Sequence, residues 1–198
     1  MARKPKLNII IASTRPGRSG PAVAAWAHEL VQQHGRFEAE LVDLAEFDLP
    51  LLDEGFHPIM RRYEHEHTRR WSQSVGSADA FLFITPEYDY FPPAALVNAI
   101  QYLFHEWTYK PAAIVSYGGV SGGLRSAQVL RSLLGNLNAV AINQPVPAPF
   151  VQQYIGEDGV FRPESILNEG LEALLTELHK WAVALEPMRE RNQLKVAS

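Results

Sequence analysis

Short apolar runs rich in branched residues alternate along the chain with longer stretches in which apolar residues recur every three or four positions. The short runs predict strands, most of them buried on both faces, and the longer stretches predict amphipathic helices. The predicted strands are residues 7–12, 40–44, 80–85, 112–116 and 139–143. Helical periodicity begins near Val23, Leu96, Val129 and Ile166. The pattern therefore predicts five successive β/α units.

Strict alternation of strands and helices is typical of one open parallel sheet with right-handed crossovers and helices on both faces. Five strands favour the order 2-1-3-4-5, which makes a flavodoxin-like three-layer αβα fold. We expect a single domain over residues 1–186 and a charged, solvated tail over 187–198. Residues 47–61 and 145–163 show no clear period, so we expect loops over the functional site or at a subunit contact.

Composition narrows the classes of function. The chain has 198 residues, of which 46% are hydrophobic and 20% charged, as in ordinary globular proteins. Its net charge of −4 argues against a surface that binds nucleic acid or anionic lipid. The absence of cysteine excludes disulfides and thiolate chemistry and is consistent with a cytoplasmic protein. No run approaches the ~18 apolar residues of a membrane span. We therefore expect small-molecule partners.

The loop after the first predicted strand has the character of an anion site. It runs from Ser13 to Gly20 and is followed by Pro21, which favours the start of a helix. Helix-start N–H groups, loop hydroxyls and the guanidinium groups of Arg15 and Arg18 can surround a terminal phosphate monoester. The motifs GxGxxG and GxxxxGK[ST] are absent here, which argues against a Rossmann-type dinucleotide site and against a nucleoside triphosphatase. The alternative is a capped helix with surface arginines.

The loops after the third and fourth strands have the composition of a site for a planar ring. Residues 85–93 (TPEYDYFPP) combine prolines with aromatics, and residues 117–125 (YGGVSGGLR) contain four glycines. Glycine lets a flat ligand approach the backbone, and aromatic side chains can flank it. All three loops are expected at one edge of the sheet, where strand order reverses. The alternatives are a proline-rich turn with core aromatics and a flexible glycine turn.

Together these segments resemble the NADPH-dependent FMN reductase family of flavodoxin-like flavoproteins, which includes quinone, azo-dye and chromate reductases. The resemblance runs from the first strand to the fourth helix, about two-thirds of the chain. It implies three groups of FMN-binding residues, one at the phosphate and two along the ring. The phosphate group is Ser13, Arg15, Arg18, Ser19 and Gly20, and the ring groups are Pro86, Glu87, Tyr88 and Asp89, and Ser116, Tyr117, Gly118 and Gly119.

The chain departs from the family pattern at two places. The family usually has PEYN and LKNAID where this chain has PEYD, ending at Asp89, and LVNAIQ over residues 96–101. A carboxylate at position 89 loses the donor role of an amide and, if ionised, opposes negative charge on a reduced flavin.

The resemblance implies an FMN-dependent NAD(P)H oxidoreductase that passes electrons from NADPH or NADH to quinones, azo compounds, free flavin or metal oxyanions. The chemistry is then carried by FMN, so no catalytic side chain and no metal is expected. Arg125 is a further candidate for binding the phosphates of NADPH. Family resemblance also implies a homodimer or homotetramer with the flavin near the contact.

Two alternatives remain open. A flavodoxin-type electron carrier would bind FMN without turning over a pyridine nucleotide, although the chain lacks the long acidic runs that dock such carriers. A serine hydrolase would use Ser121 in GVSGG with Asp158 and His179, but the elbow needs its serine directly after the strand, and residues 117–120 intervene here. His65 and His67 resemble a metal pair, yet two residues apart on a helix they are expected to point to different faces.

Overall fold

The apolar side chains of the strands divide between two clusters on opposite faces of one sheet. In the computed structural model, which describes residues 3–190, Leu82 belongs to one cluster and its neighbour Phe83 to the other. This alternation follows from the period of two in a β-strand. Because both faces of the strand are apolar, the sheet is covered by helices on both sides.

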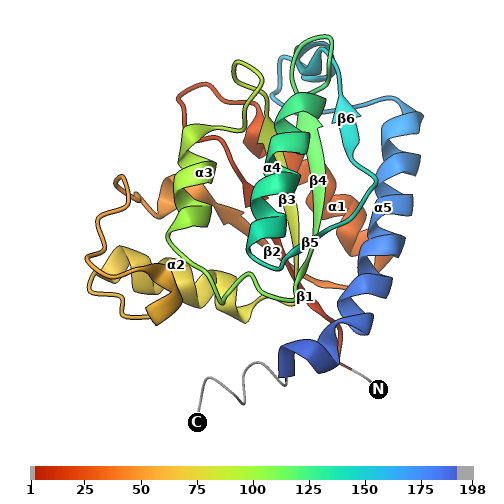
Figure 1. Ribbon diagram of the computed structural model, residues 1–198. Helices are drawn as coiled ribbons and strands as arrows, with labels where there is room; N and C mark the ends of the chain where they lie inside the picture. Colours follow the sequence, from red (N-terminus) through yellow and green to blue (C-terminus); the bar gives the residue numbers. More distant parts are fainter. Residues whose placement is uncertain (1–2, 191–198) are drawn as a thin grey trace.

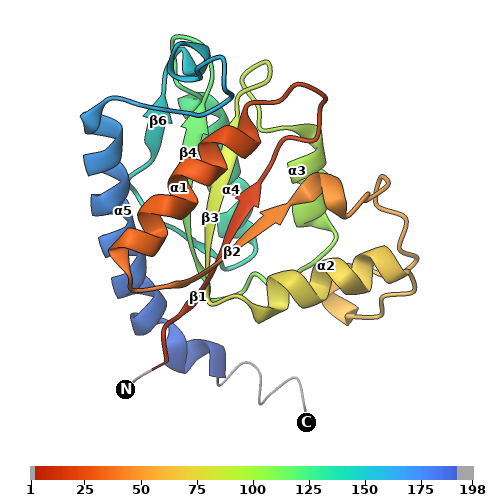
Figure 2. The same ribbon diagram turned by 180° about the vertical axis from the view of Figure 1, so that it is seen from behind.

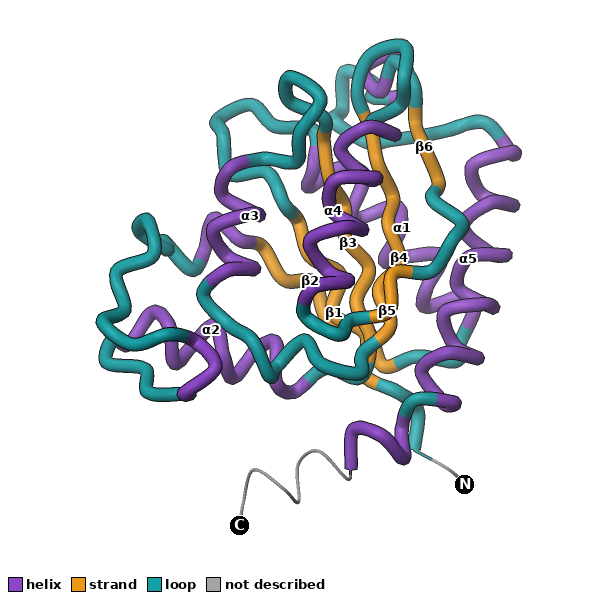
Figure 3. Tube along the Cα trace, in the orientation of Figure 1, coloured by secondary structure: helices purple, strands orange, loops and turns teal. Residues whose placement is uncertain are grey.

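The sheet order is β2-β1-β3-β4-β5, with every pair parallel, as predicted from the alternation of elements. The four long strands are visible in the centre of the molecule (Figure 3). Their bounds are β1 (Lys6–Ile11), β2 (Glu38–Asp43), β3 (Ala80–Pro86) and β4 (Pro111–Tyr117).

Within residues 3–190, five helices form the two outer layers. One cluster includes residues of α1 (Gly20–His34) and α5 (Ser165–Ala184), which lie together on one face (Figure 2). The opposite face is covered by three helices (Figure 1). These are α2 (Glu66–Ser77), α3 (Ala94–Gln101) and α4 (Leu124–Asn136). The flavodoxin-like three-layer fold is therefore confirmed.

The fifth strand is shorter than predicted and is divided. Instead of one strand over 139–143, β5 (Val140–Ala141) pairs with the start of β4, and β6 (Val146–Ala148) pairs with its end. Pro147 lies within β6, and a proline is tolerated there because β6 is an edge strand. The divided strand delivers the following residues to the carboxyl edge of the sheet, where the loops after β1, β3 and β4 also lie.

The end of the described chain is packed more closely than expected. Residues 186–190 are helical, and Arg189 is only 7% exposed. Its guanidinium donates to the carbonyl of Ala182 at 2.9 Å and lies 3.7 Å from the carboxylate of Asp79. The rest of the expected tail, residues 191–198, lies outside the described residues. Among the helices within residues 3–190, none has the length and apolar character needed to cross a membrane.

The buried side chain of Lys110 caps the carboxyl end of α2 at the amino edge of the sheet. Lys110 donates from Nζ to the carbonyls of Val75 at 2.8 Å and Gly76 at 3.0 Å, which belong to the last turn of the helix. The Val75 carbonyl also accepts from the N–H of Ala78 at 3.3 Å. Burial lowers the pKa of Lys110 to about 7, although the nearby Asp79 carboxylate opposes this shift. The neutral amine still has two N–H donors, so both hydrogen bonds survive deprotonation.

We expect the free energy of unfolding to rise between pH 7 and pH 9, because over this range the unfolded chain keeps the Lys110 proton that the folded chain has released. The difference of one bound proton between the unfolded and folded chains raises the free energy of unfolding by at most about 1.4 kcal/mol per pH unit. Urea unfolding of wild type and Lys110→Met at pH 7, 8 and 9 measures the slope. Equal slopes in the two proteins would contradict the shifted pKa.

Candidate functional site

Loops at the carboxyl edge of the sheet enclose a pocket of about 500 Å³. Eight of the thirteen residues predicted to bind the cofactor line it, together with a segment that no sequence motif marked. The predicted residues in the lining are Arg15, Ser19, Pro86, Glu87, Tyr88, Tyr117, Gly118 and Gly119, and the additional ones are Phe150, Val151, Gln152 and Gln153. The other five predicted residues, Ser13, Arg18, Gly20, Asp89 and Ser116, lie outside the lining. Ser13, Arg18 and Asp89 are in the same loops, Gly20 opens α1, and Ser116 is near the end of β4.

The start of α1 is pressed against the floor of the pocket. Gly20 opens the helix, and a Cβ at this position would lie 2.6 Å from Oγ of Ser13 and 3.1 Å from the hydroxyl of Tyr117. Ser13 is fully buried, and its Oγ is 3.2 Å from the Tyr117 hydroxyl. Only glycine fits at position 20. The first-turn N–H groups and the positive end of the helix dipole are thereby held next to the pocket, which is the arrangement of an anion site.

The two loop arginines have different surroundings. Arg18 makes a bidentate pair with Asp43 at the end of β2, with distances of 2.8 and 2.5 Å, and also donates to the carbonyl of Ser13. Both side chains of this pair are less than one-fifth exposed. Arg15 is exposed and lines the pocket. In this structure Arg18 therefore holds the loop against the sheet, whereas Arg15 lines the pocket.

The loop after β3 contains a two-residue hairpin turn. Tyr88 and Phe91 exchange both backbone hydrogen bonds at 2.9 Å, and the central residues Asp89 and Tyr90 have φ of 50° and 73°. Two positive φ values define a type I′ turn, and aspartate tolerates this conformation as asparagine does. Asp89 is exposed at the tip. Its electronic effect on a flavin therefore stays a prediction.

A charged cluster joins the loop after β3 to the loop after β4. The Glu87 carboxylate accepts hydrogen bonds from Ser121 Oγ at 3.0 Å, from the backbone N–H of Arg125 at 3.1 Å and from Arg125 Nε at 2.6 Å. Arg125 also lies over the ring of Tyr90 at 3.9 Å. Burial acts to raise the pKa of Glu87, but the hydrogen bonds from Arg125 and Ser121 outweigh it and hold the pKa below its usual value. The cluster fixes the two loops relative to one another.

This arrangement bears directly on the hydrolase alternative. The hydroxyl of Ser121 donates to a carboxylate rather than to a histidine. Asp158 is paired with a neighbouring arginine, and His179 packs edge-on against Phe37 at 5.5 Å. His179 lines a different cavity, which lies at the amino edge of the sheet with residues that precede β1. The three residues of the supposed triad are therefore not assembled.

The glycines of the loop after β4 serve two purposes. Gly123 has φ of 83°, and a Cβ there would lie 2.7 Å from the backbone nitrogen of Tyr117, so the turn itself requires glycine. Ser116 supports the same turn by donating from Oγ to the carbonyl of Gly122 at 2.9 Å. A Cβ on Gly119 would instead meet nothing within 4 Å, so the backbone there is open to the pocket. Tyr117 is 4% exposed, and burial raises the pKa of its hydroxyl.

Residues 150–153, which follow β6, form a further wall of the pocket. Backbone N–H groups of Phe150 and Val151 donate to the carbonyls of Gly119 and Gly118 at 3.1 and 3.3 Å. Gln152 donates from Nε2 to Oγ of Ser19 at 2.7 Å, which links this segment to the anion loop. The lack of a clear period over residues 145–163 predicts a loop over the site or at a subunit contact, but it does not mark these residues, because their role depends on contacts with distant parts of the chain.

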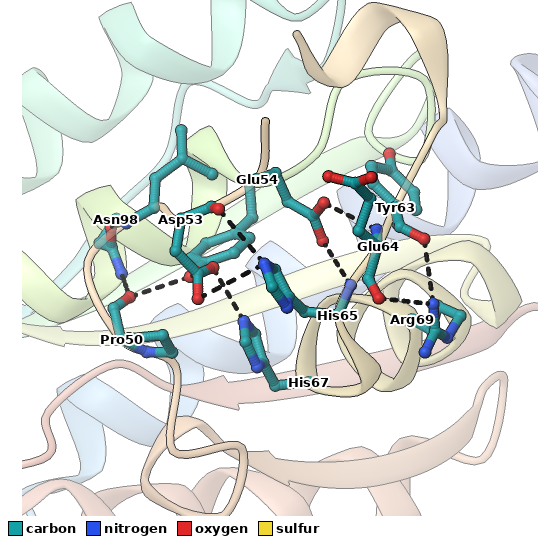
Figure 4. Close-up of polar contacts among 11 residues, drawn as sticks. Pro50, Asp53, Glu54, Tyr63, Glu64, His65, His67, Arg69 and Asn98 are labelled. Atoms are coloured by element: carbon teal, nitrogen blue, oxygen red, sulfur yellow. Dashed lines mark hydrogen bonds and ion pairs between the residues drawn. The ribbon is translucent and has the colours of Figure 1, made fainter. Parts of the chain in front are cut away.

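His65, which immediately precedes α2, and His67, which lies in its first turn, are side by side. Their rings stack at 5.2 Å with an interplanar angle of 8°, and both approach Asp53 (Figure 4). The expectation that they point to different faces is wrong, because His65 precedes the helix as its N-cap residue. His67 Nε2 lies 3.0 Å from the Asp53 carboxylate, which also accepts from Tyr102 at 2.9 Å. These contacts anchor the loop between β2 and α2 on α3. Within residues 3–190, no group of three or more suitable side chains is placed to hold a metal.

The chain is similar to known proteins in sequence and in fold. The model of the NADPH-dependent FMN reductase family matches residues 5–152. An NAD(P)H-dependent FMN reductase of Schizosaccharomyces pombe is 42% identical over 127 residues, which are 63% of this chain and 64% of that protein. A probable NADPH:quinone oxidoreductase of Oryza sativa subsp. japonica is 30% identical over 191 residues, 89% of this chain and 88% of that protein.

Solved structures show the same fold at lower sequence identity. FerB, a flavoenzyme NAD(P)H:(acceptor) oxidoreductase from Paracoccus denitrificans, superposes with a TM-score of 0.70 at 22% identity. The match covers 91% of this chain and 98% of FerB.

Arg18→Ala should lower the free energy of unfolding by about 1–3 kcal/mol, because it leaves the largely buried Asp43 carboxylate without its charged partner. Arg18→Lys should retain part of this stability, since an ammonium group cannot make the bidentate pair. Urea unfolding measures both variants. Asp43→Asn keeps a side-chain oxygen for the N–H of Ala45, so it is the second variant of a double-mutant cycle. If the stability losses of the two single variants add up to the loss of the double variant, the ion pair contributes nothing to the free energy of unfolding.

Proposed function

The chain belongs to the NADPH-dependent FMN reductase family, and from this premise we propose that it is an FMN-dependent NAD(P)H oxidoreductase. Its electron acceptors are quinones, azo compounds, free flavin or metal oxyanions. The observation that carries the proposal is the pocket at the carboxyl edge of the sheet, which joins an anion cradle to an open glycine backbone and an aromatic loop.

The residues of the pocket fit FMN at both ends. Gly20 allows the start of α1 to come within reach of a phosphate, and Arg15 and Ser19 line the same end of the pocket. A planar ring needs backbone donors along its polar edge and open surface at its face. The uncovered backbone at Gly119 supplies the open surface, with Tyr88 and Tyr117 beside it. The N–H groups of Glu87 and Tyr88 already donate to the carbonyls of Tyr117 and Phe91, so they hold the ring loop in shape. Ser13, Arg18 and Ser116 act from outside the lining by shaping the loops.

FMN, when bound, supplies the redox chemistry between the nicotinamide and the acceptor. The chain's own residues bind and position the reactants. The pairing of Glu87 with Ser121 and Arg125 keeps the loops after β3 and β4 at a fixed separation. It also balances the Glu87 charge beside the proposed ring site. Arg125 remains 46% exposed, so part of its guanidinium is free to meet the phosphates of NADPH.

We further propose that the protein acts in the cytoplasm as a homodimer or homotetramer with the flavin near the contact. The absence of cysteine supports a reducing compartment. Large apolar side chains near the pocket mouth support a subunit contact there, because Tyr90, Phe91 and Val120 are 59%, 59% and 77% exposed.

Anaerobic mixing of the FMN-loaded protein with NADPH, and separately with NADH, tests the function. We expect the visible flavin absorbance to bleach within seconds and to return when a quinone is added. Persistence of the absorbance over minutes would instead identify an electron carrier. A protein that does not bind FMN at all would remove the proposal.

Arg15→Ala should weaken FMN binding about tenfold to a hundredfold, because it removes a charge-assisted contact to a dianionic phosphate. Riboflavin lacks the phosphate, so its affinity should be unchanged. Titration of the apoprotein with both ligands measures the difference. Arg36→Ala is the matched control, since Arg36 is an exposed arginine that lines the cavity at the amino edge of the sheet. Equal losses for FMN and riboflavin would mean that Arg15 does not contact the phosphate.

A further inference from the structure

Phe150 combines two features that are unfavourable for a bulky side chain. Its backbone is left-handed, with φ of 48° and ψ of 46°, a conformation that glycine adopts freely and other residues avoid. Its side chain is nevertheless 54% exposed, so burial of the ring does not offset the strain. Strain that is held in place beside a pocket indicates a functional role for the side chain.

The backbone around Phe150 is fixed by contacts with the pocket loops. Its N–H donates to the carbonyl of Gly119, its carbonyl accepts from the N–H of Gln153 at 2.9 Å, and Gln152 is bonded to Ser19. These hydrogen bonds determine the left-handed turn. They place the Phe150 ring in the wall of the same pocket that contains Tyr88 and Gly119.

Tyr90, a second exposed aromatic residue in a left-handed conformation at this edge, already has a contact for its ring. Tyr90 occupies the second central position of the hairpin turn, and the guanidinium of Arg125 lies over its ring at 3.9 Å. Tyr109 also has positive φ, at 60°, but it lies two residues before β4 at the amino edge of the sheet. Phe150 therefore combines a strained backbone, an exposed ring and a place in the pocket wall.

We propose that Phe150 determines specificity for the electron acceptor: its exposed ring is the aromatic surface against which a planar, ring-containing acceptor packs at the pocket mouth. This inference rests on the proposed function and deepens it. Aromatic rings pack favourably in stacked or edge-on arrangements, and such a contact distinguishes a quinone from a small inorganic oxidant. It also explains why a strained backbone is retained at a position where glycine would be unstrained.

The test uses the FMN-loaded protein and the naphthoquinone menadione. Calorimetric titration of the oxidised protein without nicotinamide gives the dissociation constant for menadione. We expect this constant to rise roughly fivefold in Phe150→Gly and to stay within about twofold of wild type in Phe150→Tyr, which keeps the aromatic ring. The melting temperature of Phe150→Gly should not fall, because glycine accommodates the left-handed backbone.

Steady-state kinetics provide a second readout. In Phe150→Gly the KM for menadione should rise, whereas the KM for ferricyanide, which has no ring to stack, should not change. Tyr109→Gly is the matched control, because it replaces an aromatic residue of positive φ at the opposite edge of the sheet. This variant should leave the affinity for menadione unaltered.

The outcomes separate this inference from the proposed function. Unchanged menadione affinity in Phe150→Gly, in a protein that NADPH still bleaches, overturns the role of Phe150 and leaves the function intact. A loss of FMN affinity as large as the loss of menadione affinity also overturns it, because Phe150 would then be a flavin contact. Failure of NADPH to bleach the wild-type protein overturns the proposed function itself, whatever the binding of menadione.

Discussion

The parallel pairing of β1, β3 and β4 is the constraint on which the rest of the site depends. Ile11 is paired with Ile84, and Thr85 with Ser116, so all three strands end at one edge of the sheet. Side chains more than a hundred residues apart in sequence therefore meet, as the contact of Ser13 with Tyr117 shows. In parallel sheets this edge is where ligands bind, because helix starts and loop N–H groups converge there.

Once the loops are brought together, close contacts fix them individually. Gly20 and Gly123 permit approaches that any Cβ would prevent, and the Glu87 cluster joins the loops after β3 and β4. Strained residues are found at the same edge, including the hairpin turn at Asp89 and the left-handed Phe150. Such strain persists only where surrounding hydrogen bonds over-determine the backbone. The pocket is thus held ready by the fold rather than formed by one flexible loop.

The two loop arginines show why composition alone does not assign a role. The same loop contributes Arg18, whose guanidinium is bound by Asp43 from β2, and Arg15, which lines the pocket. The histidine pair gives a similar lesson, because the helix begins one residue after His65 and both rings then lie together. In each case a neighbour distant in sequence, or a helix boundary, decides what the side chain does.

From the sequence alone, four of the five helices within residues 3–190, the parallel order of the strands and the three loops of the site were predictable, because burial on both faces of a strand and turn chemistry are local properties. The periodicity did not mark α2. The sequence could not determine that the fifth strand is divided, since β5 and β6 are defined only by pairing with β4. Nor could it identify Phe150 and Gln152, which have no motif and reach the pocket through bonds to Gly119 and Ser19. These features depend on non-local contacts, and the energy of such a contact exists only once the chain has brought both partners together.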